Sequence, residues 1–464
     1  MPRLGPLAVW LDSDHVGVLE QSRRGELQLA YNEVARRRWP LGIPLVSCSM
    51  PLSLSPYRKR QAFPFFDGLL PEGEVRRMIA YDLGLDEQDT FGLLHALGRD
   101  CAGALVLQPV TEPPPRSPAL GDAEPMTAED VARRLAQLRS APLGADRRVR
   151  VSLPGMQHKL LLTRLMDGSW ALPLGAAPST HILKPPIELL EGSVENEAFC
   201  MRLARRVGLE VANVAIECFG ERSVLVVERF DRVVLPGHEV RRVHQEDICQ
   251  AFSVRGTAKY EERGGPSLKM VAGLLRKWDA PADDIVRLLR VVTFTTVIGD
   301  ADRHSKNITV FHREDGSIRL APLYDVMCTR LYPSVSTVLG MFVNGKQEVD
   351  SVGVDDLVVE GMSWGLSEQT ARDAVGGVLE ALPEAVEAEA EASPFVPANL
   401  VEVLHKRSEA RRTSMAKPPL VSLAPGVVTV APVLPGRVWV KPYRRRDGTP
   451  VNGHWHQLPV TSCE

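Results

Sequence analysis

A short polar segment between two apolar runs holds the residues of this chain that are best suited to chemistry. Residues 297 to 311 read VIGDADRHSKNITVF, with Asp302 five positions before Asn307. The same spacing separates the base and the metal-binding asparagine in the catalytic loop of protein kinases. There, a carboxylate orients an acceptor hydroxyl and accepts its proton, and an amide oxygen helps to hold Mg²⁺ at the polyphosphate. One short loop can therefore supply two roles of a phosphoryl-transfer site.

Further residues extend this set in chain order. Asp325 in LAPLYDVM follows an apolar run 23 positions after Asp302, where a second metal-binding carboxylate is expected. Lys184 in THILKP lies on a strand-like run, ahead of a helical segment that carries Glu195 and Glu197. A strand lysine that contacts phosphates, oriented by a helix glutamate, completes a kinase-like set.

Each of these pieces also has a purely structural explanation. A DxHxxN segment can form a polar turn between buried elements, and a lysine on a strand before a helix glutamate is common. An aspartate after a strand usually caps the next helix. Their order is the stronger evidence, because lysine, glutamate helix, VVERF, DRHSKN and YD follow one another as in a two-lobed kinase.

Composition excludes several other classes of protein. The chain has 464 residues, 44% of them hydrophobic and 24% charged, as expected for a globular protein of two or three domains. Its net charge of -3 gives no overall signal for nucleic acid. Seven dispersed cysteines without a CxxC pair favour reduced thiols and argue against a zinc site. No apolar stretch is long enough to span a membrane, so we expect a cytoplasmic protein without a membrane partner.

Local patterns predict the elements that must position these residues. Thr127 is expected to cap a helix in TAEDVARRLAQLRS, and Ser193 a helix in SVENEAFCMRLARRVGLE that Gly208 closes. Residues 148 to 165 are typical of strand, turn and strand, and HILKP and SVLVVERF of two further strands. From about residue 244 to 410 the long runs have helical periodicity. A small α/β lobe followed by a larger helical lobe is therefore expected.

Longer motifs resemble one family, the HipA serine/threonine kinases, which are toxins of HipBA-type toxin-antitoxin modules. PFFDGLLPEGEVR and LGRDCAGAL resemble its N-terminal domain. SLPGMQHK, THILKP, ENEAFCMRLARRVGL, VVERFDR, HQEDICQAF, GDADRHSKN and APLYDV resemble successive motifs of its kinase core. The resemblance implies an α/β, bilobal, protein-kinase-like fold with a β-rich N-lobe and a helical C-lobe. The expected divisions are 1–110 (HipA N-terminal subdomain), 111–126 (proline-rich connector), 127–240 (N-lobe), 241–414 (C-lobe) and 415–464 (basic tail).

The resemblance also implies roles for single residues. Asp302 would be the catalytic base, and Asn307 and Asp325 would bind Mg²⁺. The loop from Pro154 to Lys159 would cover the ATP phosphates; it holds one glycine, unlike the glycine-rich loop of ordinary protein kinases. The residues expected at ATP are Pro154, Gly155, Met156, Gln157, His158, Lys159, Lys184, Glu228, Arg229, Phe230, His304, Ser305, Lys306, Asn307, Tyr324 and Asp325.

The family also implies regulation and partners. Ser152 matches a serine that family members autophosphorylate, which ejects the adjacent loop and switches the kinase off. A HipB-like DNA-binding antitoxin would be the partner, forming a complex with operator DNA. The protein substrate would belong to the translation machinery, for example an aminoacyl-tRNA synthetase.

Two alternatives remain open at this point. Asp-Arg-His followed by Asn also resembles the catalytic loop of phosphoinositide kinases, so a lipid or small-molecule kinase is the second enzyme hypothesis. A non-catalytic corepressor partner of a DNA-bound protein is the alternative from another class. The tail from Met415 carries six Lys/Arg against two Asp/Glu, and GRVWVKPYRRRDGTPVNGHWHQLPV favours a small β-hairpin over a nucleic-acid-binding segment.

Overall fold

The fold is described from a computed structural model of the chain. It describes residues 4–116, 118–139, 152–175, 177–393 and 396–415, together with four short strands between positions 437 and 457. The chain divides into two compact units, Met1–Ala416 and Lys417–Glu464, and each is described by itself.

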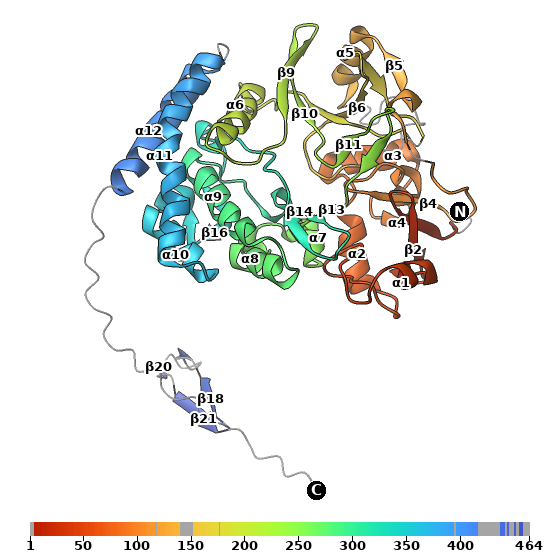
Figure 1. The fold of residues 1–464 in the computed structure, drawn as a ribbon, viewed down its shortest axis with the longest axis horizontal. Coiled ribbons are helices and arrows are strands. Elements are labelled where there is room, and N and C mark those ends of the chain that lie inside the picture. The colour runs from red at the N-terminus through yellow and green to blue at the C-terminus, as the bar shows by residue number, and fades with distance from the viewer. Residues whose placement is uncertain are drawn as a thin grey trace. The chain divides into compact units, whose positions relative to one another are not determined.

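The N-terminal part of the first unit is an antiparallel sheet packed with short helices (Figure 1). Its elements are β1 (Leu7–Leu11), β2 (Asp14–Gln21), β3 (Leu27–Tyr31), α1 (Glu33–Arg38), α2 (Lys59–Asp67), α3 (Gly73–Leu83), α4 (Thr90–Leu97) and β4 (Leu105–Pro109). The strand order is β3-β2-β1-β4, so the last strand returns to pair with the first. Phe65 and Phe66 of α2 are fully buried in this core and meet edge to face at 5.1 Å.

The next part of the chain contains a six-stranded sheet in the order β5-β7-β6-β8-β10-β9. Its elements are η1 (Leu120–Asp122), β5 (Glu124–Met126), α5 (Ala128–Gln137), β6 (Leu160–Arg164), β7 (Trp170–Leu172), β8 (His181–Lys184), α6 (Ser193–Arg206), β9 (Val214–Phe219) and β10 (Arg222–Glu228). Thr127 caps α5 as predicted, because its side chain accepts a hydrogen bond from the Asp130 backbone N–H. Strands β8 and β10 pair antiparallel, with Lys184 opposite Leu225. This pairing places Lys184 on an inner strand of the sheet.

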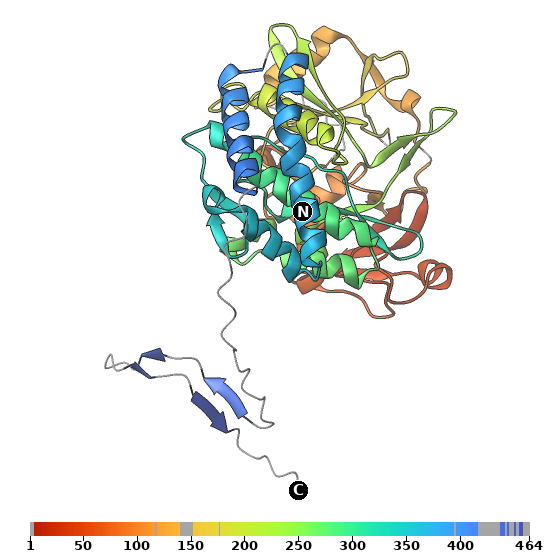
Figure 2. The same cartoon turned by 60° about the vertical axis from the view of Figure 1, so that its left-hand side comes forward.

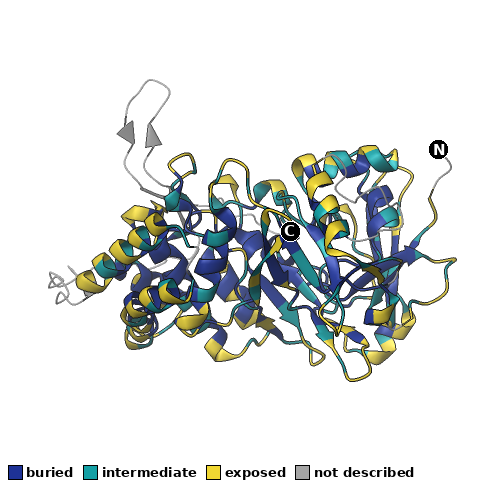
Figure 3. Ribbon diagram, turned by 90° about the horizontal axis from the view of Figure 1, so that it is seen from above, coloured by how far each residue is buried: buried dark blue, intermediate teal, exposed yellow. Residues whose placement is uncertain are grey.

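The remainder of the first unit is mainly helical. Its elements are β11 (Arg232–Val234), β12 (Val240–Arg242), β13 (Gln245–Asp247), α7 (Ile248–Ala251), η2 (Gly256–Ala258), η3 (Glu261–Arg263), α8 (Leu268–Lys277), α9 (Ala282–Ile298), η4 (Ser305–Asn307), β14 (Thr309–His312), β15 (Ile318–Leu320), η5 (Thr329–Leu331), β16 (Val338–Val343), β17 (Lys346–Glu348), η6 (Val349–Ser351), α10 (Val354–Ser363), α11 (Glu368–Ala392) and α12 (Ala398–Met415). Helix α9 is buried along most of its length, and α10, α11 and α12 pack beside it (Figures 1 and 2). The exposed residues lie mainly on the outward faces of helices and on loops (Figure 3). The first unit therefore has the mixed α/β architecture that was predicted.

A buried ionic group joins the N-terminal part to the segment that follows β10. We call Asp100, Arg229, Asp231 and Arg232 the junction cluster. Nη2 of Arg232 lies 2.7 Å from Asp100, and Nη2 of Arg229 lies 2.9 Å from Asp231. All four side chains are at most 2% exposed. Their mutual neutralisation makes burial of four charges feasible.

One local prediction differs from the structure, and another is described only in part. Ser193 does not cap α6 but is its first residue, because Gly192, with a left-handed φ of 68°, occupies the capping position. The hydroxyl of Ser193 instead accepts a hydrogen bond from the Ile187 N–H and fixes the preceding loop. Of the predicted strand, turn and strand over 148–165, the structure shows the second strand as β6; residues 148–151 lie outside the described residues.

The second unit contains two antiparallel strand pairs. Strand β18 (Arg437–Val440) pairs with β21 (His454–Gln457), and β19 (Tyr443–Arg444) pairs with β20 (Pro450–Val451). The backbone pairing is that of a hairpin. The predicted Asp-Gly turn lies outside the described residues.

Candidate active site

Most of the residues singled out in the sequence line one pocket. This pocket has a volume of about 380 Å³, a size that accommodates a small ligand. From the predicted set it is lined by Pro154, Gly155, Met156, Gln157, Lys159, Lys184, Glu228, Arg229, Phe230, Asp302, His304, Lys306, Asn307, Tyr324 and Asp325. His158, Ser305 and Ser152 are the predicted residues that do not line it.

Lys184 pairs with two carboxylates that line the pocket. Its Nζ donates hydrogen bonds to Glu197 Oε1 on α6 at 2.7 Å and to Asp325 Oδ1 at 2.6 Å. Burial opposes the charge on Lys184, but the carboxylates of Asp325 and Glu197 outweigh it and raise the pKa of the ammonium group. Lys184 is therefore cationic at neutral pH and held at the inner wall of the pocket.

Asp325 reaches this position through an unusual backbone conformation. Its φ is 57°, in the left-handed region that residues other than glycine rarely adopt. Enclosure in the pocket would raise the pKa of its carboxyl group, but Lys184 holds that pKa well below its usual range. The carboxylate is therefore ionised, and its side chain remains 41% exposed towards the pocket. Such strained residues are concentrated at functional sites.

Asp302 lies just beyond the C-terminus of α9. Gly299, with a φ of 82°, ends the helix, and the following segment turns back towards β14. Oδ1 of Asp302 accepts a hydrogen bond from the Tyr260 hydroxyl at 2.8 Å. Enclosure by the pocket walls raises the pKa of Asp302, and the Tyr260 hydrogen bond opposes this shift. A carboxylate in this setting can orient a hydroxyl and accept its proton.

Hydrogen bonds within and around the loop hold Asp302 and Asn307 in place. Arg303 donates to the carbonyl of Asn307 at 2.7 Å and to that of Tyr324 at 3.3 Å, which links the loop to the Asp325 segment. Ser305 is fully buried, and its hydroxyl donates to the Lys259 carbonyl at 2.7 Å. Ser305 thus supports the loop from behind instead of lining the pocket.

The segment from Glu228 to Phe230 contains the end of β10 and the start of its connection to β11, and it lines the pocket. Phe230 packs against Phe311 and Tyr324, each at a ring-centroid distance of 5.6 Å, which forms an aromatic wall. The Arg229 side chain is buried in the junction cluster, and the Glu228 carboxylate accepts a hydrogen bond from Asn213 near the surface. Of the three side chains, that of Phe230 is best placed to contact a flat ring.

The loop from residue 154 to 159 closes on itself. Nζ of Lys159 donates to the Pro154 carbonyl at 2.6 Å, and Gly155 has a φ of 118° that a side chain would strain. Burial lowers the pKa of Lys159 to about 8. Ser152, just ahead of the loop, is fully buried, and its hydroxyl donates to the Leu69 carbonyl at 2.7 Å. The hydroxyl of Ser152 therefore points into the N-terminal part of the chain.

Among the pocket residues that sequence analysis did not assign to the site are Glu72, Lys259 and Tyr260. Glu72 comes from the N-terminal part, and the other two lie on the loop before α8. The signals available were the motifs LLPEG and KYEERGG, but a single sequence does not show that these loops meet the catalytic segment.

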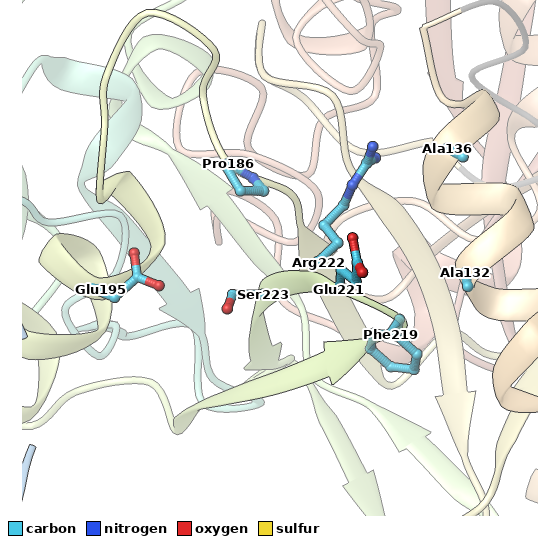
Figure 4. Close-up of a pocket in the computed structure, with 8 residues that line it drawn as sticks. All are labelled: Ala132, Ala136, Pro186, Glu195, Phe219, Glu221, Arg222 and Ser223. Carbon is cyan, nitrogen blue, oxygen red and sulfur yellow. The ribbon is translucent and has the colours of Figure 1, made fainter. Parts of the chain in front are cut away.

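A second hollow, of about 580 Å³, has a different set of lining residues (Figure 4). It is lined by Ala132, Ala136, Pro186, Glu195, Phe219, Glu221, Arg222 and Ser223. Glu195 therefore faces this hollow, whereas Glu197, two positions later on the same helix, pairs with Lys184. The structure thus distinguishes between the two glutamates that the sequence left open.

Cys48, Glu246 and His312 form a further cluster, with potential ligand atoms within 4.8 Å of one another. Glu246 Oε1 lies 3.0 Å from His312 Nε2 and accepts a hydrogen bond from the Cys48 backbone N–H at 2.7 Å. These contacts satisfy the carboxylate without a metal ion. Burial also raises the pKa of the Cys48 thiol, which disfavours the thiolate that a metal would need. The cluster connects β13 and β14 to the N-terminal part.

Comparison with known proteins agrees with this geometry. The fold is kinase-like, and the chain belongs to the HipA family. The HipA-like C-terminal domain matches residues 151–386, and the HipA N-terminal domain matches residues 7–108. No helix in the described part of the chain is long and apolar enough to cross a membrane.

Individual relatives carry kinase names. The "Putative kinase Y4mE" of Sinorhizobium fredii is 38% identical over 387 residues, which cover 82% of this chain and 90% of that protein. The "Serine/threonine-protein kinase toxin HipA" of Shewanella oneidensis is 31% identical over 336 residues, which cover 69% of this chain and 76% of that protein.

A solved structure shows the same architecture. In the complex of HipA, HipB and operator DNA from Shewanella oneidensis, the matched chain superposes with a TM-score of 0.75 at 26% sequence identity. The match covers 88% of this chain and 96% of that chain.

Proposed function

We propose that this protein is an ATP- and Mg²⁺-dependent serine/threonine protein kinase that acts as a growth-arresting toxin. The observation that carries the proposal is the contact of Lys184 with both Glu197 and Asp325, in the same pocket as Asp302 and Asn307. In kinases such a lysine contacts the ATP phosphates, and its pairing with a helix glutamate accompanies the active arrangement.

Each residue then has a defined task. Phe230 and Tyr324 receive the adenine ring, and Lys184 contacts the phosphates. The loop from Pro154 to Lys159 covers those phosphates. Asp302 orients the hydroxyl of a protein acceptor and accepts its proton as the hydroxyl oxygen bonds to the γ-phosphorus and ADP leaves.

The residues present also suit a magnesium ion. The Asp325 carboxylate and the Asn307 amide oxygen form an all-oxygen donor set, which Mg²⁺ prefers. When bound, Mg²⁺ would neutralise charge that develops on the phosphates. The ionised state of Asp325 prepares it for this role.

Two regulatory features belong to the proposal. Autophosphorylation of Ser152 would switch the kinase off, and a HipB-like DNA-binding antitoxin would neutralise it. The Shewanella HipA, crystallised with HipB and operator DNA, supports such a partner. The acceptor would be a protein of translation, with an aminoacyl-tRNA synthetase as the first candidate to test.

The direct test is transfer of radiolabelled γ-phosphate from ATP to a panel of translation proteins, with and without Mg²⁺. Asp302→Asn is expected to lower transfer by about 10²- to 10⁴-fold, because it removes the general base. Glu314→Gln, an exposed change near β14, is the matched control and should leave transfer unchanged. Wild-type activity in Asp302→Asn would contradict the assignment of the base. Transfer to lipids or small molecules alone would favour the second enzyme hypothesis.

A further inference from the structure

An acidic residue of the N-terminal part reaches the catalytic loop. Glu72 directly precedes α3, and its Oε1 lies 2.6 Å from Nζ of Lys306, between Asp302 and Asn307 in the sequence. Its Oε2 lies 3.6 Å from Nζ of Lys259, the residue before Tyr260. One carboxylate thus contacts both segments that carry the groups around the proposed base.

The backbone of Glu72 contacts the loop from Pro154 to Lys159. The Glu72 N–H donates to the Gly155 carbonyl at 3.2 Å, and Pro71 pairs with Gly155 as an isolated parallel bridge. Glu72 therefore connects the loop expected over the phosphates with the loop expected to bind the acceptor. Both contacts come from the N-terminal part, outside the matched C-terminal domain.

The contact between Glu72 and Lys306 joins opposite charges that are largely shielded from solvent. The Lys306 side chain is 6% exposed and that of Glu72 is 21% exposed. Burial would raise the pKa of Glu72, but Lys306 and Lys259 outweigh it and lower that pKa to about 2. Asp247 lies 3.7 Å from Lys306 and is the second carboxylate near this ammonium group. Without Glu72, Lys306 would have to turn towards Asp247 or towards the phosphates.

We propose that Glu72 is a positioning residue for phosphoryl transfer, so that the N-terminal part of the chain is a working component of the catalytic site. The inference rests on the proposed kinase function and extends it to a residue that does not touch the reacting atoms. It fixes Lys306, and through Lys306 the separation of Asp302 from Asn307. A loop displaced by about 1 Å can lose roughly 10²-fold in rate while substrates still bind.

The test is a double-mutant cycle in the full-length chain. Glu72→Gln keeps the size of the side chain and its backbone bond to Gly155 but removes the charge. Glu74→Gln, an exposed change two positions later in α3, is the control. Lys306→Met provides the second edge of the cycle, and Glu72→Gln/Lys306→Met completes it.

Three quantities are measured: kcat for transfer to protein, Kd for ADP by fluorescence titration, and the melting temperature. We expect Glu72→Gln to lower kcat about 10- to 100-fold with Kd for ADP within about threefold of wild type. Glu74→Gln should match wild type. In the Lys306→Met background, Glu72→Gln should lower kcat no further, because the residue through which it acts is gone.

The outcomes separate the alternatives. An unchanged kcat in Glu72→Gln would overturn the proposal. The proposal would also be overturned if Glu72→Gln lowered kcat equally in the wild-type and Lys306→Met backgrounds and lowered the melting temperature. A purely structural effect of Glu72→Gln would be independent of Lys306. If the wild-type protein transfers no phosphate but binds ADP and melts cooperatively, the kinase function itself fails. If it is active and only the Glu72 effect is missing, the kinase function stands.

Discussion

Nζ of Lys184 lies 2.6 Å from Oδ1 of Asp325, so the proposed phosphate-binding lysine and the proposed metal-binding carboxylate neutralise each other. Glu197 contacts the same ammonium group but is only 7% exposed, whereas the Asp325 side chain is 41% exposed. A cation that enters from the pocket therefore meets Asp325 and not Glu197. We infer that nucleotide binding exchanges the Lys184–Asp325 contact and retains the Lys184–Glu197 contact.

The first prediction concerns Asp325. Asp325→Ala should abolish the part of ATP affinity that depends on Mg²⁺ and reduce phosphoryl transfer by at least about 10²-fold, because a charged metal ligand is lost. Calorimetric titration of ATP with Mg²⁺ and with EDTA measures the difference. Asp315→Ala, at the exposed turn between β14 and β15, should retain the Mg²⁺-dependent part of ATP affinity. Equal Mg²⁺ enhancement in Asp325→Ala and wild type would exclude Asp325 as a ligand.

The second prediction concerns Ser152. Its hydroxyl is buried against the Leu69 carbonyl, and its N–H donates to the Asp100 carbonyl at 3.0 Å. A phosphate would bring a charge of about -1.5 to -2 next to a carbonyl oxygen, so the segment has to leave this position. We expect phosphate on Ser152 in protein purified from cells, and greatly weakened ATP binding in that form.

Mass spectrometry with peptide mapping and nucleotide titration check this expectation. Ser152→Ala should remain unmodified and bind ATP, whereas Ser152→Asp should bind it poorly. Hydrogen exchange at residues 152–159 should be faster in the phosphorylated form. A phosphorylated form that bound ATP as tightly as the unmodified protein would refute the switch. Arg148 and Arg150, four and two positions before Ser152 in the sequence, lie outside the described residues.

The third prediction concerns growth. Expression of the wild-type chain should arrest growth, and a small HipB-like protein should bind it and relieve the arrest. Asp302→Asn should not arrest growth but should still bind that protein, because Asp302 lies in the pocket and not in the fold core. Colony counts after induction and co-purification provide the two readouts. Full toxicity of Asp302→Asn would indicate a corepressor or another non-catalytic mechanism.

The fourth prediction concerns the second unit. A chain that ends near Met415 should keep phosphoryl transfer and its melting temperature, because residues up to Ala416 form a compact unit. The removed segment carries a net charge of +4, so any nucleic-acid binding by the full chain should weaken with salt and disappear on truncation. Filter binding at several salt concentrations measures this. Loss of folding would show that the segment contributes to the core.

Local features of the site could be predicted from the sequence. Asp302 and Asn307 are close in the chain, and the helical period of α9 and the strand pattern of β8 are local signals. Ser193 was assigned wrongly because a serine before a helix is a good cap, and the left-handed conformation of Gly192 depends on the surrounding loop. The Glu72 contact was missed because it depends on packing between segments more than 180 residues apart.

The junction cluster has a consequence for inheritance. Asp100 is encoded in the N-terminal part, whereas Arg229, Asp231 and Arg232 are encoded in the kinase core, so exchange of either part replaces only one side of the cluster. A kinase core that lost its companion would retain buried arginines with too few carboxylates, and a broken buried pair costs about 3–5 kcal/mol. That penalty is comparable to much of the stability of a typical domain. A new combination of an N-terminal part with a kinase core therefore needs a carboxylate at the position of Asp100 to keep both arginines paired.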